Sequence, residues 1–165
     1  MSAPHEPRPP TDHPYLAHIP LERARWQEFT ALCRSLTPEE RTLPGYYSDP
    51  AWSVKDLVAH IGTWLAEAQI QLERVTAGTY EELPIDVDAL NAKFLDAMRG
   101  QPWPVVWVQA HAARNWMLRA WFGVRTTTDA ANWWASKSGA DHYEEHLPRL
   151  RDWVAELAAA RRQHR

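Results

Sequence analysis

The strongest constraint on the fold is one long periodic stretch between Ser53 and Gly78. Apolar residues recur there at intervals of three or four, which is the repeat of a helix with one apolar face. The residues of this stripe are Val54, Leu57, Val58, Ile61, Leu65, Ala68, Leu72 and Val75. Ser53 with Asp56 three residues later predicts a capping box at the start, and Gly78 is a suitable stop. We therefore expect an uninterrupted helix of about seven turns, of the kind that helix bundles are built from.

Three more long helices are expected on the same grounds. Their approximate ranges are 21–36, 103–122 and 139–162, and shorter helices are expected near 86–99 and after Thr128. Residues 37–52 are interrupted by several prolines and a glycine, which predicts a loop. No stretch shows the sustained alternation of a β-strand. The sequence therefore predicts an all-α fold, a four-helix bundle with short accessory helices.

The first twenty residues contain six prolines, which exclude a regular helix there. We expect a flexible, Pro-rich N-terminal arm over 1–20 and one bundle domain over 21–165. The total length of 165 residues fits a single domain of ordinary size. The arm contains His5, His13 and His18, which we expect to be solvated loop residues.

Charge and cysteine content exclude several classes of protein. The net charge is -3, which gives no support for a nucleic-acid partner. Cys33 is the one cysteine, so neither an intrachain disulfide nor a cysteine metal cage can form. No apolar run approaches the roughly 20 residues of a membrane span, and the N-terminus has no apolar signal-peptide core. We expect a cytoplasmic protein that contacts neither nucleic acid nor membranes.

Three histidines are candidates for metal binding. His142 and His146 are four residues apart, which places both imidazoles on one helix face. Two neutral imidazoles so placed can share one divalent metal, and His60 on the Ser53–Gly78 helix is the third candidate. At about 100° per residue, all three lie at the edges of their apolar stripes. That position suits a site at an open end of a bundle and suits solvated surface histidines equally well.

Two motifs resemble those of the DinB-like bundle superfamily. Trp52-Ser53-Val54-Lys55-Asp56-Leu57-Val58-Ala59-His60 resembles its W-S-x-K-D-x-x-A-H motif, and the segment 142–147, His-Tyr-Glu-Glu-His-Leu, resembles its second motif. The superfamily includes the YfiT-like proteins, the mycothiol-dependent maleylpyruvate isomerases and the ClbS/DfsB-like proteins. The segment 88–91, Asp-Ala-Leu-Asn, is similar to the ClbS-like branch. The resemblance covers about residues 21–160.

The resemblance implies a four-helix bundle that holds one divalent metal, zinc or nickel, on His60, His142 and His146. Three protein ligands leave an open position for water or a substrate thiol. Family members of known activity are mostly thiol S-transferases that use mycothiol, bacillithiol or glutathione, and others are hydrolases or self-protection proteins. An isomerase activity is not expected, because the chain lacks an obvious extra C-terminal domain of the kind that some mycothiol-dependent relatives carry.

Six further residues are candidates for the surroundings of the metal. Asp56 lies one turn before His60, where it can orient an imidazole, although its capping role explains it as well. Trp64, one turn after His60, fits a pocket wall or the core equally. His111 and Arg114, with Asn115 next to them, are the polar groups in the apolar third long helix. One of the three is a candidate to face the pocket, with Arg114 as an anchor for a substrate carboxylate, and a solvated face is the alternative for each. Glu145 beside His146 is a pocket candidate or a solvated surface group.

Three functions are compatible with these features. The first is an enzyme in which the metal activates a low-molecular-weight thiol or water for attack on a small electrophile in detoxification. The second is a protein that sequesters a drug-like ligand in a tryptophan-lined cleft without turnover, which the 10 tryptophans favour. The third is a structural bundle with a vestigial site. A homodimer is expected in each case, because a helix that is apolar almost all round requires a second layer.

Overall fold

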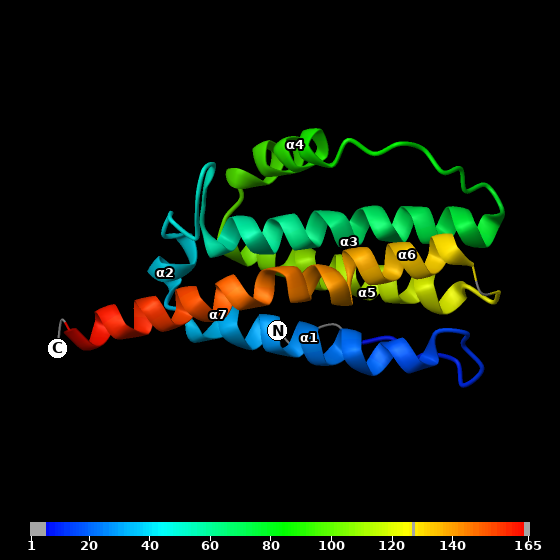
Figure 1. Cartoon of the computed structure of the whole chain (residues 1–165), viewed down its shortest axis with the longest axis horizontal. Coiled ribbons are helices and arrows are strands. Elements are labelled where there is room, and N and C mark those ends of the chain that lie inside the picture. The colour runs from blue at the N-terminus through cyan, green and yellow to red at the C-terminus, as the bar shows by residue number, and fades with distance from the viewer. Residues whose placement is uncertain (1–5, 127, 164–165) are drawn as a thin grey trace.

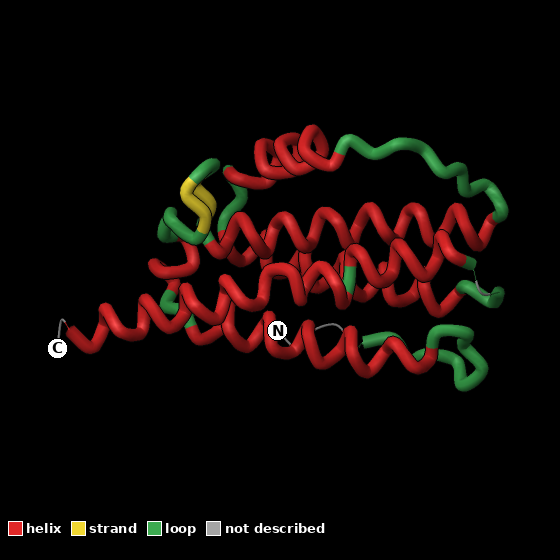
Figure 2. Tube along the Cα trace, viewed as in Figure 1, coloured by secondary structure: helices red, strands yellow, loops and turns green. Residues whose placement is uncertain are grey.

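The structure is a computed structural model that describes residues 6–126 and 128–163, and it is all-α apart from one short hairpin. Figures 1 and 2 show the order of the elements along the chain. The helices are η1 (Leu16–His18), α1 (Ile19–Ser35), α2 (Pro38–Thr42), α3 (Val54–Ala77), α4 (Val87–Arg99), α5 (Trp103–Gly123), α6 (Asp129–Ser138) and α7 (Ala140–Gln163). The strands are β1 (Tyr47–Ser48) and β2 (Ala51–Trp52), which pair antiparallel.

Four long helices, α1, α3, α5 and α7, run alongside one another down the long axis of the molecule (Figure 1). Helix α3 packs most extensively on α5, and α1 packs on α7. The close contact between α3 and α5 depends on Gly62, because a Cβ at this position would lie 3.0 Å from the Cα of Ala110. The predicted all-α class is confirmed.

Helix α3 begins and ends as its sequence predicts. The Ser53 hydroxyl oxygen accepts a hydrogen bond from the backbone N–H of Asp56, and the Asp56 carboxylate accepts one from the backbone N–H of Ser53 at 2.8 Å. Gly78 ends the helix with φ of 71°, a left-handed conformation that glycine adopts without strain. Residues 54–77 therefore form one uninterrupted helix, and the cap at Ser53 fixes where His60 lies along it.

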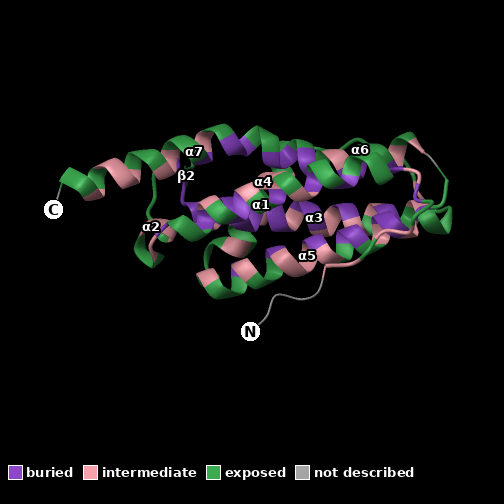
Figure 3. Ribbon diagram, turned by 90° about the horizontal axis from the view of Figure 1, so that it is seen from below, coloured by how far each residue is buried: buried purple, intermediate pink, exposed green. Residues whose placement is uncertain are grey.

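The core lies between the long helices and continues under α6. Figure 3 shows the buried residues on α3 and on the inward sides of α1, α5 and α7. Helix α4 has no fully buried residue and lies on the outer side of α3 (Figure 1). It is therefore the least enclosed of the longer helices, although Phe94 and Leu95 pack against the core.

Three local expectations need correction. The end of the expected arm is helical, since η1 spans Leu16–His18 and α1 already begins at Ile19, where Pro20 occupies a first-turn position that proline tolerates. The segment 37–52 is not all loop, since it contains α2 and the β1–β2 hairpin.

His13 is buried, not solvated: its Nε2 atom lies 2.6 Å from the carbonyl oxygen of Trp121, and the neighbouring Tyr15 donates a hydrogen bond to the carbonyl of Thr128 at 2.7 Å. A histidine and a tyrosine can satisfy backbone carbonyls at a helix end while their rings pack on aromatic side chains. Of the other two histidines of the arm, His18 is exposed as expected, and His5 lies outside the residues that the structure describes.

Helix α5 is only partly enclosed, although its sequence is apolar almost all round. Val106, Met117 and Trp121 are buried, whereas Val108 and Trp116 are 54% and 56% exposed. No described helix has both the length and the apolar character needed to span a membrane.

Candidate metal centre

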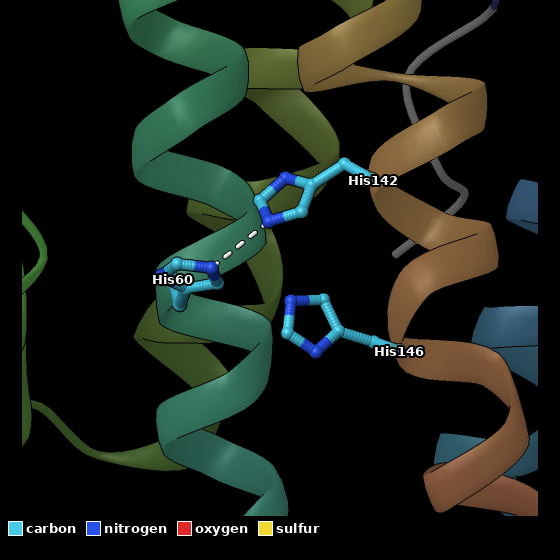
Figure 4. Close-up of side chains that lie close together, drawn as sticks. All are labelled: His60, His142 and His146. Atoms are coloured by element: carbon cyan, nitrogen blue, oxygen red, sulfur yellow. Dashed lines mark hydrogen bonds between the residues drawn. The ribbon is translucent and has the colours of Figure 1, made fainter. Parts of the chain in front are cut away.

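Helices α3 and α7 bring the three candidate histidines together. His60 projects from the first half of α3, and His142 and His146 project from the first two turns of α7 (Figure 4). All three side chains are buried, at 8%, 8% and 7% exposure. The sequence left open whether these residues form a site or are solvated surface histidines. Their burial excludes the second alternative.

The ring nitrogens of the three histidines face one point. Nε2 of His60 lies 2.9 Å from Nε2 of His142, and the two residues are 82 positions apart in the chain. One nitrogen from each of the three residues lies within 4.8 Å of the other two. Figure 4 shows the His146 ring turned toward the other two from one turn further along α7. This buried group of three imidazoles could hold one metal ion.

Burial keeps these imidazoles neutral. Burial, and after it the electrostatic effect of the neighbouring His146, lowers the pKa of His60 to about 3. Burial, followed by the neighbouring His60 and His146, holds the pKa of His142 well below its usual value, and burial also lowers the pKa of His146. A neutral imidazole is the form that binds a metal ion, so the cluster is in its binding form at neutral pH.

The spacing of the cluster fits a small divalent ion. Zinc binds imidazole nitrogen at about 2.0–2.1 Å, and tetrahedral geometry then separates two nitrogen ligands by about 3.3 Å. The His60–His142 pair at 2.9 Å and the outer limit of 4.8 Å bracket this value. The nitrogens would therefore have to move by up to about 1.5 Å to reach the separation of a tetrahedral zinc site.

A tyrosine that the sequence did not indicate holds His146 in place. The Tyr47 hydroxyl lies 3.0 Å from Nδ1 of His146, which leaves Nε2 directed at the cluster. The neighbouring Tyr46 donates a hydrogen bond to the backbone carbonyl of the same histidine at 3.3 Å. Both tyrosines come from the segment expected to be a loop. The turn residues at 44–45 and 49–50 predict a loop, and strands of two residues each are too short to show a pattern of their own.

The cluster opens into a cleft of about 370 Å³. Trp64 forms part of the cleft wall, which was one of the two roles predicted for it. Its indole N–H donates a hydrogen bond to the side-chain oxygen of Asn91 at 2.8 Å. Glu145 also lines the cleft, as does Trp52, whose ring centroid lies 5.1 Å from that of His60. A cleft of this size leaves room for a small molecule beside the three ring nitrogens.

Helices α4 and α6 supply cleft residues that the sequence analysis missed. They are Val87, Asn91, Trp133, Trp134, Lys137 and Ser138. Asn91 belongs to the segment 88–91 that resembles the ClbS-like branch, and this resemblance was the available signal for it. The others lie on helices predicted only as accessory elements, and their position depends on tertiary packing.

The Asp56 carboxylate is used by the helix cap. Its Oδ2 atom accepts hydrogen bonds from the backbone N–H and the hydroxyl of Ser53, both at 2.8 Å. Its Oδ1 atom is buried and has no hydrogen-bond partner among residues 6–126 and 128–163, and the same holds for Nδ1 of His60 one turn later. The capping role is therefore confirmed, and orientation of His60 stays a prediction.

None of the three polar candidates on α5 lines the cleft, so the expectation that one of them faces it is wrong. Arg114 is buried toward α1, where its guanidinium donates two hydrogen bonds to the carboxylate of Glu22 at 2.7 and 2.5 Å. His111 lies between two tryptophans, with ring centroids 5.0 Å from Trp26 and 4.7 Å from Trp107. A buried polar group needs a partner, but a carboxylate of α1 supplies it here and a ligand does not.

Comparison with known proteins returned no match: no protein-family model fits the chain, and no curated protein or solved structure showed significant similarity to it.

Proposed function

We propose that this chain is a DinB-like bundle protein that holds one divalent metal, zinc or nickel, on His60, His142 and His146. In this proposal it transfers a low-molecular-weight thiol, or water, to a small electrophile. The observation that carries the proposal is the meeting of the two motifs. Their histidines are 82 residues apart in sequence and 2.9 Å apart in space, with a third imidazole beside them in a buried cluster.

The chain's own residues would divide the work as follows. The three imidazoles hold the metal, which when bound lowers the pKa of a thiol or water beside it and so supplies a nucleophile at neutral pH. Tyr47 fixes the ring of His146 through Nδ1, as hydrogen bonds to metal-binding histidines generally do. Trp52 and Trp64 exclude water from one side of the cleft, and Lys137 places a positive charge at its edge.

The test is a turnover screen with matched metal-free and metal-loaded protein. Zinc- and nickel-loaded samples are mixed with mycothiol, bacillithiol, glutathione or no thiol, together with a panel of small electrophiles, and products are followed by mass spectrometry. Product that requires the metal and disappears in His60→Ala/His146→Ala supports the proposal. The exposed His18→Ala variant serves as control and should retain full turnover.

A second function, sequestration without turnover, is favoured by one observation. Four tryptophans line the cleft beside the cluster: Trp52, Trp64, Trp133 and Trp134. Indole rings give wide, rigid contact areas for a drug-like ligand. Tight binding of a panel member by the metal-loaded protein with no product would support this function in place of the transferase.

The small-molecule partner and the homodimer both stay predictions. The exposed side of α5, with Val108 and Trp116 half exposed, is the surface on which the expected dimer would form. Sedimentation across a wide concentration range tests it, and monomeric behaviour throughout would contradict the dimer.

A further inference from the structure

A second cavity adjoins the histidine cleft. Its volume is about 600 Å³, and it lies between the second half of α3, the connection 79–86 and the start of α6. Val87, Trp133 and Trp134 line both this cavity and the histidine cleft, so the two form one groove. In Figure 1 the connection passes along the outer side of α3 on its way to α4. None of the residues discussed for metal binding lies in this outer part of the groove.

The outer groove carries an excess of negative charge. Four carboxylates line it against one guanidinium, that of Arg74: they belong to Glu67, Glu81, Glu82 and Asp129. The Glu67 carboxylate accepts a hydrogen bond from the neutral side chain of Gln71 at 2.7 Å. Within the described part of the chain, no salt bridge involves any of the four carboxylates. Their charge is therefore available to a ligand.

The same groove exposes large apolar and aromatic side chains. Trp133 is 47% exposed and its ring packs edge-on against Trp134 at 4.9 Å between centroids. The indole N–H of Trp134 lies 3.4 Å from the hydroxyl of Tyr80, which also lines the groove. Leu83 and Val87 are 64% and 49% exposed on the same lining. Aromatic faces beside carboxylates attract organic cations, because the ring quadrupole and the negative charge act together.

We propose that the outer groove binds the positively charged end of an elongated amphipathic molecule, an amine or quaternary ammonium on an apolar body. The reacting end of this molecule would lie at the three histidines. The first part stands on the charge and lining of the groove alone, and the second part rests on the proposed function. The substrate class is therefore a cationic electrophile or a conjugate that carries an amine.

The first experiment measures binding to the outer groove on metal-free, full-length protein. The probes are 4-phenylbutyltrimethylammonium, the neutral 4-phenylbutanol and the anionic 5-phenylpentanoate, titrated by calorimetry at low and at physiological salt. The cation should bind about tenfold more tightly than the anion. Added salt should weaken the binding of the cation, because it screens the attraction to the carboxylates, and should leave the binding of the neutral alcohol unchanged. Equal affinity for the three probes would overturn the proposal.

Matched variants locate the cation. Glu81→Gln/Glu82→Gln removes two charges from the exposed connection 79–86 and keeps the shape of both side chains. It should weaken the binding of the cation about fivefold and leave the affinity for the neutral alcohol unchanged. Glu73→Gln removes an exposed carboxylate of α3 that lies outside the lining and should have no effect. Trp133→Ala should weaken both the cation and the alcohol. Loss of cation affinity in Glu73→Gln equal to that in the double variant would place the binding elsewhere and contradict the proposal.

Failure of this inference and failure of the metal site give different results. His60→Ala/His146→Ala should bind the cation as the unchanged protein does, because the outer groove does not include these histidines. Metal binding without cation selectivity would reject the groove and leave the proposed function standing. Cation selectivity without metal binding would support the cation site in the outer groove. It would reject the claim that the reacting end of the ligand lies at the three histidines.

Discussion

The hydroxyl of Tyr47 lies 3.0 Å from Nδ1 of His146, a residue 99 positions further along the chain. The contact joins the β1–β2 hairpin to α7 and directs the opposite nitrogen of the imidazole toward His60 and His142. A metal-binding histidine generally has such a partner, which sets its tautomer and its orientation. The hairpin therefore has a role in the candidate metal centre and does not serve only to connect α2 with α3.

Tyr47→Phe should lower the affinity of the protein for zinc by about tenfold or more, because Nδ1 of His146 loses its partner. Competition against a chromogenic chelator measures this directly. Tyr46→Phe is the matched control, since its hydroxyl contacts the backbone carbonyl of His146 and not the ring. Equal affinities in Tyr47→Phe and Tyr46→Phe would show that the hydroxyl of Tyr47 does not position the ligand.

The buried pair of Glu22 and Arg114 should stabilise the fold without affecting the metal. The two side chains are 1% and 4% exposed, and Tyr143 donates a further hydrogen bond to Glu22 at 3.1 Å. Glu22→Gln removes the buried counter-charge of the guanidinium and leaves it the carboxylate of Glu6, which lies 2.8 Å from Nη1 and is 36% exposed. The loss should therefore be about 2 kcal/mol of unfolding free energy, below the cost of a buried charge with no partner. Urea denaturation measures the loss, and metal content should not change.

The control for that variant is the exposed pair of Glu28 and Arg151. Glu28→Gln should leave the urea midpoint essentially where it is, because water screens exposed ion pairs. A destabilisation of Glu22→Gln no larger than that of Glu28→Gln would contradict a structural role for the buried pair.

Acid should destabilise the fold in part through His111. Burial, and after it the charges of Arg34 and Arg114, lowers the pKa of His111 to about 4, whereas an unfolded histidine has a pKa of about 6.5. Between these two values the unfolded chain takes up a proton that the folded chain does not, so the free energy of unfolding falls as the pH falls through this window. Allowing for its partial exposure, His111 accounts for about 1–2 kcal/mol of this loss.

His111→Gln removes this titration and should flatten the dependence of stability on pH by that amount between pH 7 and 4.5. Denaturation of metal-free protein at several pH values gives the two curves. The exposed His18→Gln variant should follow the unchanged protein. A curve for His111→Gln parallel to that of the unchanged protein would contradict the assignment.

Local sequence patterns were sufficient for the long helices and for the choice of the three clustered histidines. The stripe from Val54 to Val75 and the Ser53–Asp56 cap define α3 without any tertiary information, because a cap and a 3.6-residue period are properties of one helix. The i, i+4 spacing of His142 and His146 and the two motifs likewise predicted the three residues of the cluster. Their meeting in space is tertiary, and the spacing within one helix left it open.

What the sequence did not predict depends on contacts between distant segments. Arg114 was expected at the pocket because a buried polar group needs a partner, but the sequence does not say that this partner is Glu22, 92 positions away. Tyr47 reaches His146 only through a hairpin with two residues in each strand, which is too short to show alternation. Trp133 and Lys137 reach the cleft because α6 lies against α3 and leads into α7, which no local period indicates.

The metal content of the purified, full-length protein tests the central claim most directly. The protein is reconstituted with zinc or nickel, freed of excess metal and analysed by mass spectrometry of the elements, beside His60→Ala/His146→Ala and the exposed control His18→Ala. The three-histidine site predicts about one ion per chain in the unchanged protein and in His18→Ala, and none in the double variant. No bound ion after reconstitution, or the same stoichiometry in His60→Ala/His146→Ala, would contradict it.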